Sequence, residues 1–105
     1  MMLSKLKKLL GIAPAVDYKM LIQQGATIVD VRTAGEFAAG HVKGSINIPV
    51  DQLAKSSTQL KNKNQVIITC CASGMRSASA KSYLKSAGYQ QVYNAGSWYS
   101  LKNKI

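Results

Sequence analysis

Two cysteines stand side by side at positions 70 and 71, and one arginine follows them closely in the stretch "ITCCASGMRS" (68–77). Counted to Arg76, Cys70 gives the spacing C-x5-R and Cys71 gives C-x4-R. A thiolate close to a guanidinium is a nucleophile that faces an anionic substrate, because the planar fork of arginine matches an oxyanion. The chemistry of this protein therefore depends on which thiol is the nucleophile.

The residues after the cysteines favour a loop that leads into the N-terminus of a helix. Such a junction aims backbone N–H groups and the positive end of the helix dipole at one point, where a cysteine is favoured as thiolate. Gly74 permits the backbone to curl, and Ser73 and Ser77 can donate hydroxyl hydrogen bonds. Cys70 continues the apolar run "VIIT", so we expect a buried strand residue, whereas Cys71 begins the small-residue run that turns. Alternation along the strand should place the two side chains on opposite faces.

Segments of strand and helix character alternate along the chain and must position this loop. The apolar runs predict strands at 26–32, 45–50, 65–70 and 90–96. Helices are expected at 16–25, 33–40, 51–60 and 77–88, with a turn or helix at 97–105; Asp17 and Asp51 are the expected N-caps of the first and third. This alternation predicts an α/β fold: a single domain with a mainly parallel central sheet and helices on both faces. In such sheets ligands bind at the carboxyl ends of strands, which is where the cysteine loop stands.

Composition limits the classes of function. A chain of 105 residues with 47% apolar content has room for one domain, and its net charge of +10 indicates an anionic partner. The lysines are scattered and do not interleave with stacking aromatics, so we do not expect nucleic-acid binding. Adjacent cysteines cannot form an ordinary disulfide, which favours reduced thiols in the cytoplasm. The only histidine, His41, has no C-x-x-C partner, and we expect no metal site.

The N-terminal residues differ in character from the rest, and we divide the chain into a basic amphipathic segment (1–15) and a domain (16–105). The apolar run "LLGIA" is too short for a signal peptide, and Pro14 interrupts it. No window approaches the roughly 18 apolar residues of a membrane span. We expect a monomer and expect the segment to make no membrane contact.

Three motifs resemble those of rhodanese-homology domains, the sulfurtransferase family. "CASGMRS" (71–77) resembles the family's active loop C-x-x-G-x-R-S. "IVDVRTAGEFAAGHVKGSINIP" (28–49) resembles its D-x-R…E-F…G-H-I-x-G-A-x-N-I-P segment, and "NAGSW" (94–98) resembles its closing stretch. The resemblance covers about residues 16–101; Ser45, Ala95 and the extra Cys70 depart from the family pattern.

The resemblance implies that Cys71 takes a sulfane sulfur from a small anionic donor such as thiosulfate, becomes a persulfide, and passes the sulfur to cyanide, a thiol or an acceptor protein. It implies no cofactor. Arg76 would grip the sulfonate of the donor while backbone N–H groups hold the persulfide. The implied substrate-binding residues are Ala72, Ser73, Gly74, Met75, Arg76 and Ser77, with Asp30 and Arg32 in support.

Two alternatives stay open. A phosphatase or arsenate reductase of the same family would use Cys70 in the longer C-x5-R loop, although Gly74 lies three residues after Cys71, as the sulfurtransferase loop requires. The second alternative is a non-catalytic module that binds a partner or carries sulfur. Glu36 and His41 could suggest acid–base chemistry. Sulfur transfer to a thiolate needs no proton shuttle, however, so we expect His41 to close a loop by hydrogen bonding. We expect Trp98 to be a packing residue and not a substrate-binding one.

Overall fold

The computed structural model describes residues 15–105, which form a four-stranded sheet in the order β2-β1-β3-β4. All three neighbouring strand pairs are parallel. The strands are β1 (Thr27–Asp30), β2 (Ile46–Asn47), β3 (Val66–Cys71) and β4 (Gln91–Ser97). The α/β class and the parallel sheet expected from the sequence are confirmed.

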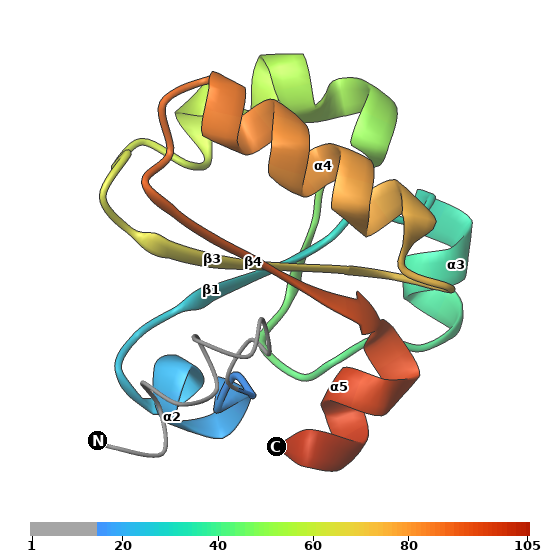
Figure 1. Ribbon diagram of the computed structural model, residues 1–105. Helices are drawn as coiled ribbons and strands as arrows, with labels where there is room; N and C mark the ends of the chain where they lie inside the picture. Colours follow the sequence, from blue (N-terminus) through green and yellow to red (C-terminus); the bar gives the residue numbers. More distant parts are fainter. Residues whose placement is uncertain (1–14) are drawn as a thin grey trace, which may run out of the picture.

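Helices cover both faces of the sheet, as expected (Figure 1). The helices are α2 (Tyr18–Gln23), α3 (Ala34–Ala39), the 3₁₀ helix η1 (Val50–Thr58), α4 (Met75–Ser86) and α5 (Trp98–Lys104). Helices α4 and η1 lie over one face, and α2 and α5 lie under the other. Helix α3 follows β1 and stands beside the carboxyl end of the sheet.

The sequence predicted two helix N-caps, and one of these two predictions is wrong. The Asp17 side chain accepts a hydrogen bond from the Met20 N–H and caps α2, as expected. Asp51 is not the N-cap of the third helix, because this 3₁₀ helix begins one residue earlier, at Val50. Its first turn is set by an i to i+3 bond from the Gln52 N–H to the Pro49 carbonyl oxygen, 2.8 Å long.

The sheet separates two apolar layers, because successive residues of a strand point to opposite faces. Along β3, Ile67 and Cys71 lie in the layer under α4 and η1, while Ile68 and Cys70 lie in the layer over α2 and α5. The upper layer also contains Leu53, Leu60, Ala80 and Leu84 among others, and the lower layer contains Ile28, Val42 and Leu101.

Strand β4 carries a bulge next to the cysteines. Asn94 pairs with Thr69, but the next pair joins Gly96 to Cys70, so Ala95 is the extra residue. The N-terminal segment lies outside the described residues except for its last residue, and its boundary stays a prediction. Between residues 15 and 105, no helix is long and apolar enough to cross a membrane.

Candidate active site

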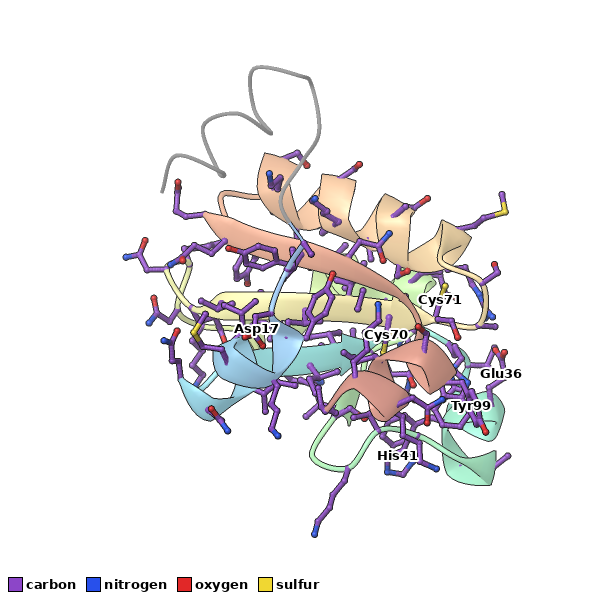
Figure 2. The ribbon with its side chains drawn as sticks, turned by 60° about the horizontal axis from the view of Figure 1, so that its bottom comes forward. Asp17, Glu36, His41, Cys70, Cys71 and Tyr99 are labelled. Carbon is purple, nitrogen blue, oxygen red and sulfur yellow. The ribbon has the colours of Figure 1, made fainter. Side chains whose placement is uncertain are left out.

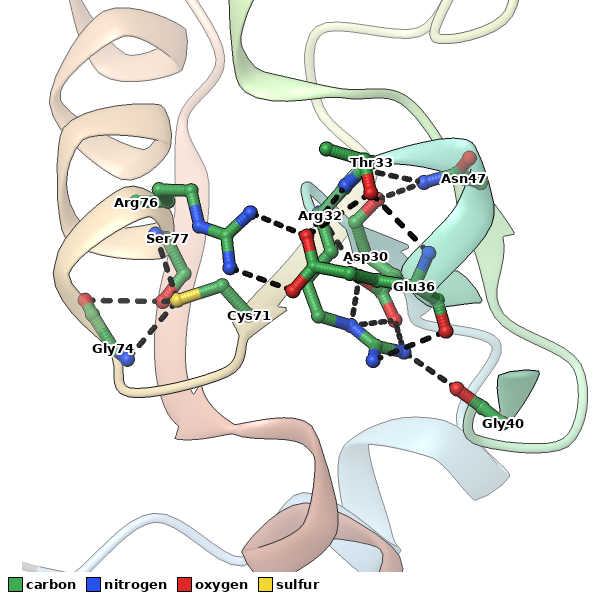
Figure 3. Close-up of polar contacts among 10 residues, drawn as sticks. All are labelled: Asp30, Arg32, Thr33, Glu36, Gly40, Asn47, Cys71, Gly74, Arg76 and Ser77. Carbon is green, nitrogen blue, oxygen red and sulfur yellow. Dashed lines mark hydrogen bonds and ion pairs between the residues drawn. The ribbon is translucent and has the colours of Figure 1, made fainter. Parts of the chain in front are cut away.

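The cysteine loop joins β3 to α4 at the carboxyl end of the sheet, where the sequence placed it. Cys71 is the last residue of β3, Gly74 is the N-cap of α4 with φ of 103°, and Met75 begins the helix. Ser77 lies in the first turn and is buried. A strand end and a helix start therefore enclose the thiol of Cys71 (Figure 3).

Three groups approach the Cys71 sulfur. The Gly74 N–H donates to Sγ at 3.0 Å, the Ser77 N–H donates at 3.4 Å, and the Ser77 hydroxyl lies 3.4 Å from Sγ. Burial by itself raises the pKa of the Cys71 thiol, but hydrogen bonds from the Ser77 side chain and from the N–H groups of Ser77, Gly74 and Ser73 outweigh it, and the pKa lies below its usual 9.0. The loop therefore favours the thiolate of Cys71.

Cys70 has the opposite environment. Its side chain lies in the lower layer, on the other face of β3 from Cys71, as predicted. Burial raises its pKa to about 12, and the charge of Asp30 adds to the rise. The N–H groups at the start of α4 donate to the sulfur of Cys71 and not to that of Cys70. The longer C-x5-R loop counted from Cys70 therefore does not surround the Cys70 sulfur with N–H groups.

The burial of Cys71 differs from the sequence interpretation. We expected Cys70 to be a buried strand residue and Cys71 to begin the turn, yet both have no exposed surface. Strand β3 extends one residue further than predicted, because Cys71 still pairs with Ser97 of the bulged strand β4.

Arg76 is engaged by a carboxylate from another helix. Its Nη1 donates to Oε1 of Glu36 at 2.7 Å and its Nη2 donates to Oε2 at 3.0 Å. Glu36 lies on α3, where Thr33 caps the helix and forms a capping box with it. Figure 3 shows the Arg76 guanidinium on the cysteine side of this pair. No local sequence signal links Glu36 to Arg76, because the two residues are 40 positions apart.

Asp30 and Arg32 form a second, buried ion pair at the end of β1. Arg32 Nη2 lies 2.7 Å from Asp30 Oδ2 and donates to the Gly40 carbonyl oxygen, also at 2.7 Å. The guanidinium stacks on the Trp98 ring, 4.6 Å from its centroid. Asn47 donates to the backbone oxygens of both Asp30 and Arg32. The pair thus joins β1 to the ends of α3 and α5.

The remaining candidate residues lie in or near the loop and differ in their exposure and contacts. Ala72 and Ser73 are exposed, and the Met75 side chain is 79% exposed. His41 stacks on Phe37 and its Nδ1 lies 2.7 Å from the Phe37 carbonyl oxygen, which matches the expected loop-closing role. In residues 15–105 no three His, Cys, Asp or Glu side chains come together as a metal site.

Asn94 supports the cysteine loop, although the sequence did not predict such a role. Asn94, at the β4 bulge, donates from Nδ2 to the Gly74 carbonyl oxygen at 3.4 Å and accepts the Gly96 N–H at 2.9 Å. It therefore ties the bulge to the cysteine loop. The only sequence signal for Asn94 is its place in "NAGSW", the stretch that resembles the family's closing motif.

Comparisons with known proteins agree with this arrangement. The family model "Rhodanese-like domain" matches residues 14–104. Thiosulfate sulfurtransferase PspE of Escherichia coli is 36% identical over 69 residues, which are 65% of this chain and 66% of PspE. Thiosulfate sulfurtransferase GlpE of Pseudomonas fluorescens is 31% identical over 88 residues, 84% of this chain and 80% of GlpE.

Solved structures show the same fold. The human single-domain sulfurtransferase TSTD1 superposes with a TM-score of 0.72 at 28% identity, covering 89% of this chain and 98% of the human one. A rhodanese from E. coli, determined with anions, gives a TM-score of 0.69 at 32% identity over 72% of this chain and 91% of that one. Sequence, loop geometry and overall fold agree, and the chain belongs to the rhodanese-like domain family.

Proposed function

We propose that the protein is a sulfurtransferase that carries a sulfane sulfur on Cys71 from an anionic donor to a thiophilic acceptor. One observation carries the proposal: the sulfur of Cys71 receives hydrogen bonds from Gly74 and Ser77 at the start of α4. These bonds favour an anionic sulfur in a buried position. The relatives named thiosulfate sulfurtransferases make thiosulfate the first donor to test.

Two displacements account for the transfer. The Cys71 thiolate attacks the outer sulfur of thiosulfate, the S–S bond of thiosulfate breaks, and sulfite leaves with the bonding electron pair. The product is a persulfide anion on Cys71, which the N–H groups of the loop stabilise. Cyanide or a thiolate then attacks the terminal sulfur, and the Cys71 thiolate departs as the leaving group. Neither step requires a general base.

The decisive test is intact mass spectrometry after incubation with thiosulfate. We expect a gain of one sulfur atom in the wild type and in Cys70→Ser, and no gain in Cys71→Ser, which should also abolish thiocyanate formation from cyanide. Cys70→Ser should keep most of that activity, since its side chain lies on the other face of β3.

Two results would contradict the proposal. Hydrolysis of an aryl phosphate that is lost in Cys70→Ser but kept in Cys71→Ser would indicate the phosphatase alternative. Thiosulfate binding without any gain of mass would indicate a binding module.

A further inference from the structure

The ion pair between Glu36 and Arg76 stands beside the cysteine loop, yet the two displacements do not use Glu36. Resting on the proposed function, we propose that Glu36 determines donor specificity: it makes the site discriminate against doubly negative donors such as thiosulfate and favour donors with less negative charge.

The carboxylate of Glu36 is held in place. Its Oε1 accepts hydrogen bonds from the Thr33 N–H at 3.0 Å and from the Thr33 hydroxyl at 3.1 Å, in addition to Arg76. The hydrogen bonds from Arg76 and Thr33 lower the pKa of Glu36 from 4.5 to about 2, so the group is an anion throughout the neutral range. The capping box of α3 therefore fixes a negative charge beside the site.

This anion occupies one edge of the Arg76 guanidinium, a group that suits an incoming sulfonate. Both Nη atoms of Arg76 donate to Glu36, one to each oxygen. A donor anion that binds at this edge must therefore displace or share the carboxylate, and it approaches a pair with no net charge. The two side chains are 36% and 35% exposed, so water and salt weaken the repulsion without removing it.

The repulsion grows with donor charge, because a Coulomb energy is proportional to each charge. Thiosulfate carries two negative charges. Methanethiosulfonate offers the same attackable outer sulfur and a sulfinate leaving group, but carries one. Removing the Glu36 charge should therefore change log(kcat/KM) about twice as much for thiosulfate as for methanethiosulfonate.

The test compares Glu36→Gln with the wild type on both donors, with cyanide as acceptor. Glutamine is also a capping-box residue, so α3 should keep its cap. We expect kcat/KM to rise roughly tenfold for thiosulfate and roughly threefold for methanethiosulfonate.

The matched control is Asp17→Asn. It removes the same charge from the N-cap of α2, far from Glu36 (Figure 2), and asparagine caps a helix as well as aspartate does. We expect less than a twofold change with either donor.

A second readout does not need sulfur transfer. Iodoacetate is anionic and iodoacetamide is neutral, so the ratio of their alkylation rates at Cys71, located by peptide mass mapping, reports the charge at the site. Glu36→Gln should raise this ratio roughly threefold, and Asp17→Asn should not.

Equal changes for both donors, a fall in kcat/KM for thiosulfate, or an unchanged alkylation ratio would overturn the specificity role. If the alkylation ratio rises but the wild type forms no persulfide with either donor, the proposed function fails while the charge effect at the site stands. If the persulfide forms and Glu36→Gln alters neither readout, only the specificity role fails.

Discussion

At the scale of single residues, Cys71 combines two opposing influences on one thiol. Complete burial disfavours the thiolate, whereas donors from the start of α4 favour it, and the donors prevail. Cys70, its neighbour in the chain, has burial without such donors, and its pKa is about 12. Adjacent residues of one strand thus differ in reactivity because the strand turns them to different faces.

Ser77→Ala tests which group stabilises the thiolate. The Ser77 hydroxyl lies 3.4 Å from Sγ, and its hydrogen bond lowers the pKa of Cys71. A lower pKa makes the thiolate abundant at lower pH, so the alkylation rate of wild-type Cys71 by iodoacetamide should reach half its maximum below pH 9. Ser77→Ala should shift this midpoint upward while the backbone N–H of residue 77 keeps part of the effect.

The control is Ser86→Ala at the other end of the same helix, where the hydroxyl donates to the Tyr83 carbonyl oxygen. Its midpoint should equal that of the wild type. An unchanged midpoint in Ser77→Ala would mean that the backbone donors alone hold the thiolate.

At the scale of elements, the cysteine loop depends on the neighbouring bulge in β4. The loop turns at Gly74, whose φ of 103° is one that other residues rarely adopt. A Cβ built on Gly74 would lie 3.3 Å from the Gly96 Cα. The bulge places Gly96, a residue without a side chain, directly against the loop.

Gly74→Ala should therefore disturb the site as well as the fold. We expect a loss of roughly 1–3 kcal/mol in the free energy of unfolding, from backbone strain and crowding, measured by urea denaturation. The same substitution should raise the pKa of Cys71, because strain at residue 74 moves the backbone N–H that donates to the sulfur at 3.0 Å.

Gly35→Ala, in helix α3, is the matched control for this substitution. A Cβ at Gly35 meets open space, so the change should leave the pKa of Cys71 as it is and stabilise the protein by about 0.4–1 kcal/mol. Equal stability of Gly74→Ala and wild type would show that the loop adapts to a side chain.

At the scale of the whole molecule, one thin sheet holds two apolar layers together. Leu84 of α4 is fully buried in the upper layer and Leu101 of α5 in the lower one. Both layers pack against alternate residues of the same strand β3, so the loss of either layer would expose one face of that strand. We infer that the domain unfolds as one unit.

Leu84→Ala and Leu101→Ala should each lower the free energy of unfolding by about 2–5 kcal/mol. Trp98 is the only tryptophan and packs against the lower layer, so its fluorescence reports that layer. In Leu84→Ala, the urea midpoint from Trp98 fluorescence should fall together with the midpoint from far-UV circular dichroism. Separate midpoints would show that the two layers unfold independently.

The sequence by itself determined the features that depend on short stretches of chain. The alternation of side-chain direction along "VIITCC" separated Cys70 from Cys71, and the resemblance of "CASGMRS" to the family's active loop, with Gly74 three residues after Cys71, indicated the thiol that the helix start would serve. The cap at Asp17 was equally local. Such features follow from backbone geometry over a few residues.

Only the tertiary structure decided the contacts between segments distant in the chain. The Glu36–Arg76 pair joins α3 to α4, and Asn94 joins β4 to the loop. The pairing with β4 that carries strand β3 on to Cys71 likewise depends on a neighbour in the fold. These contacts form because the parallel sheet brings the ends of separate strands to one edge, and no periodicity of residues along a single segment records which side chains meet there.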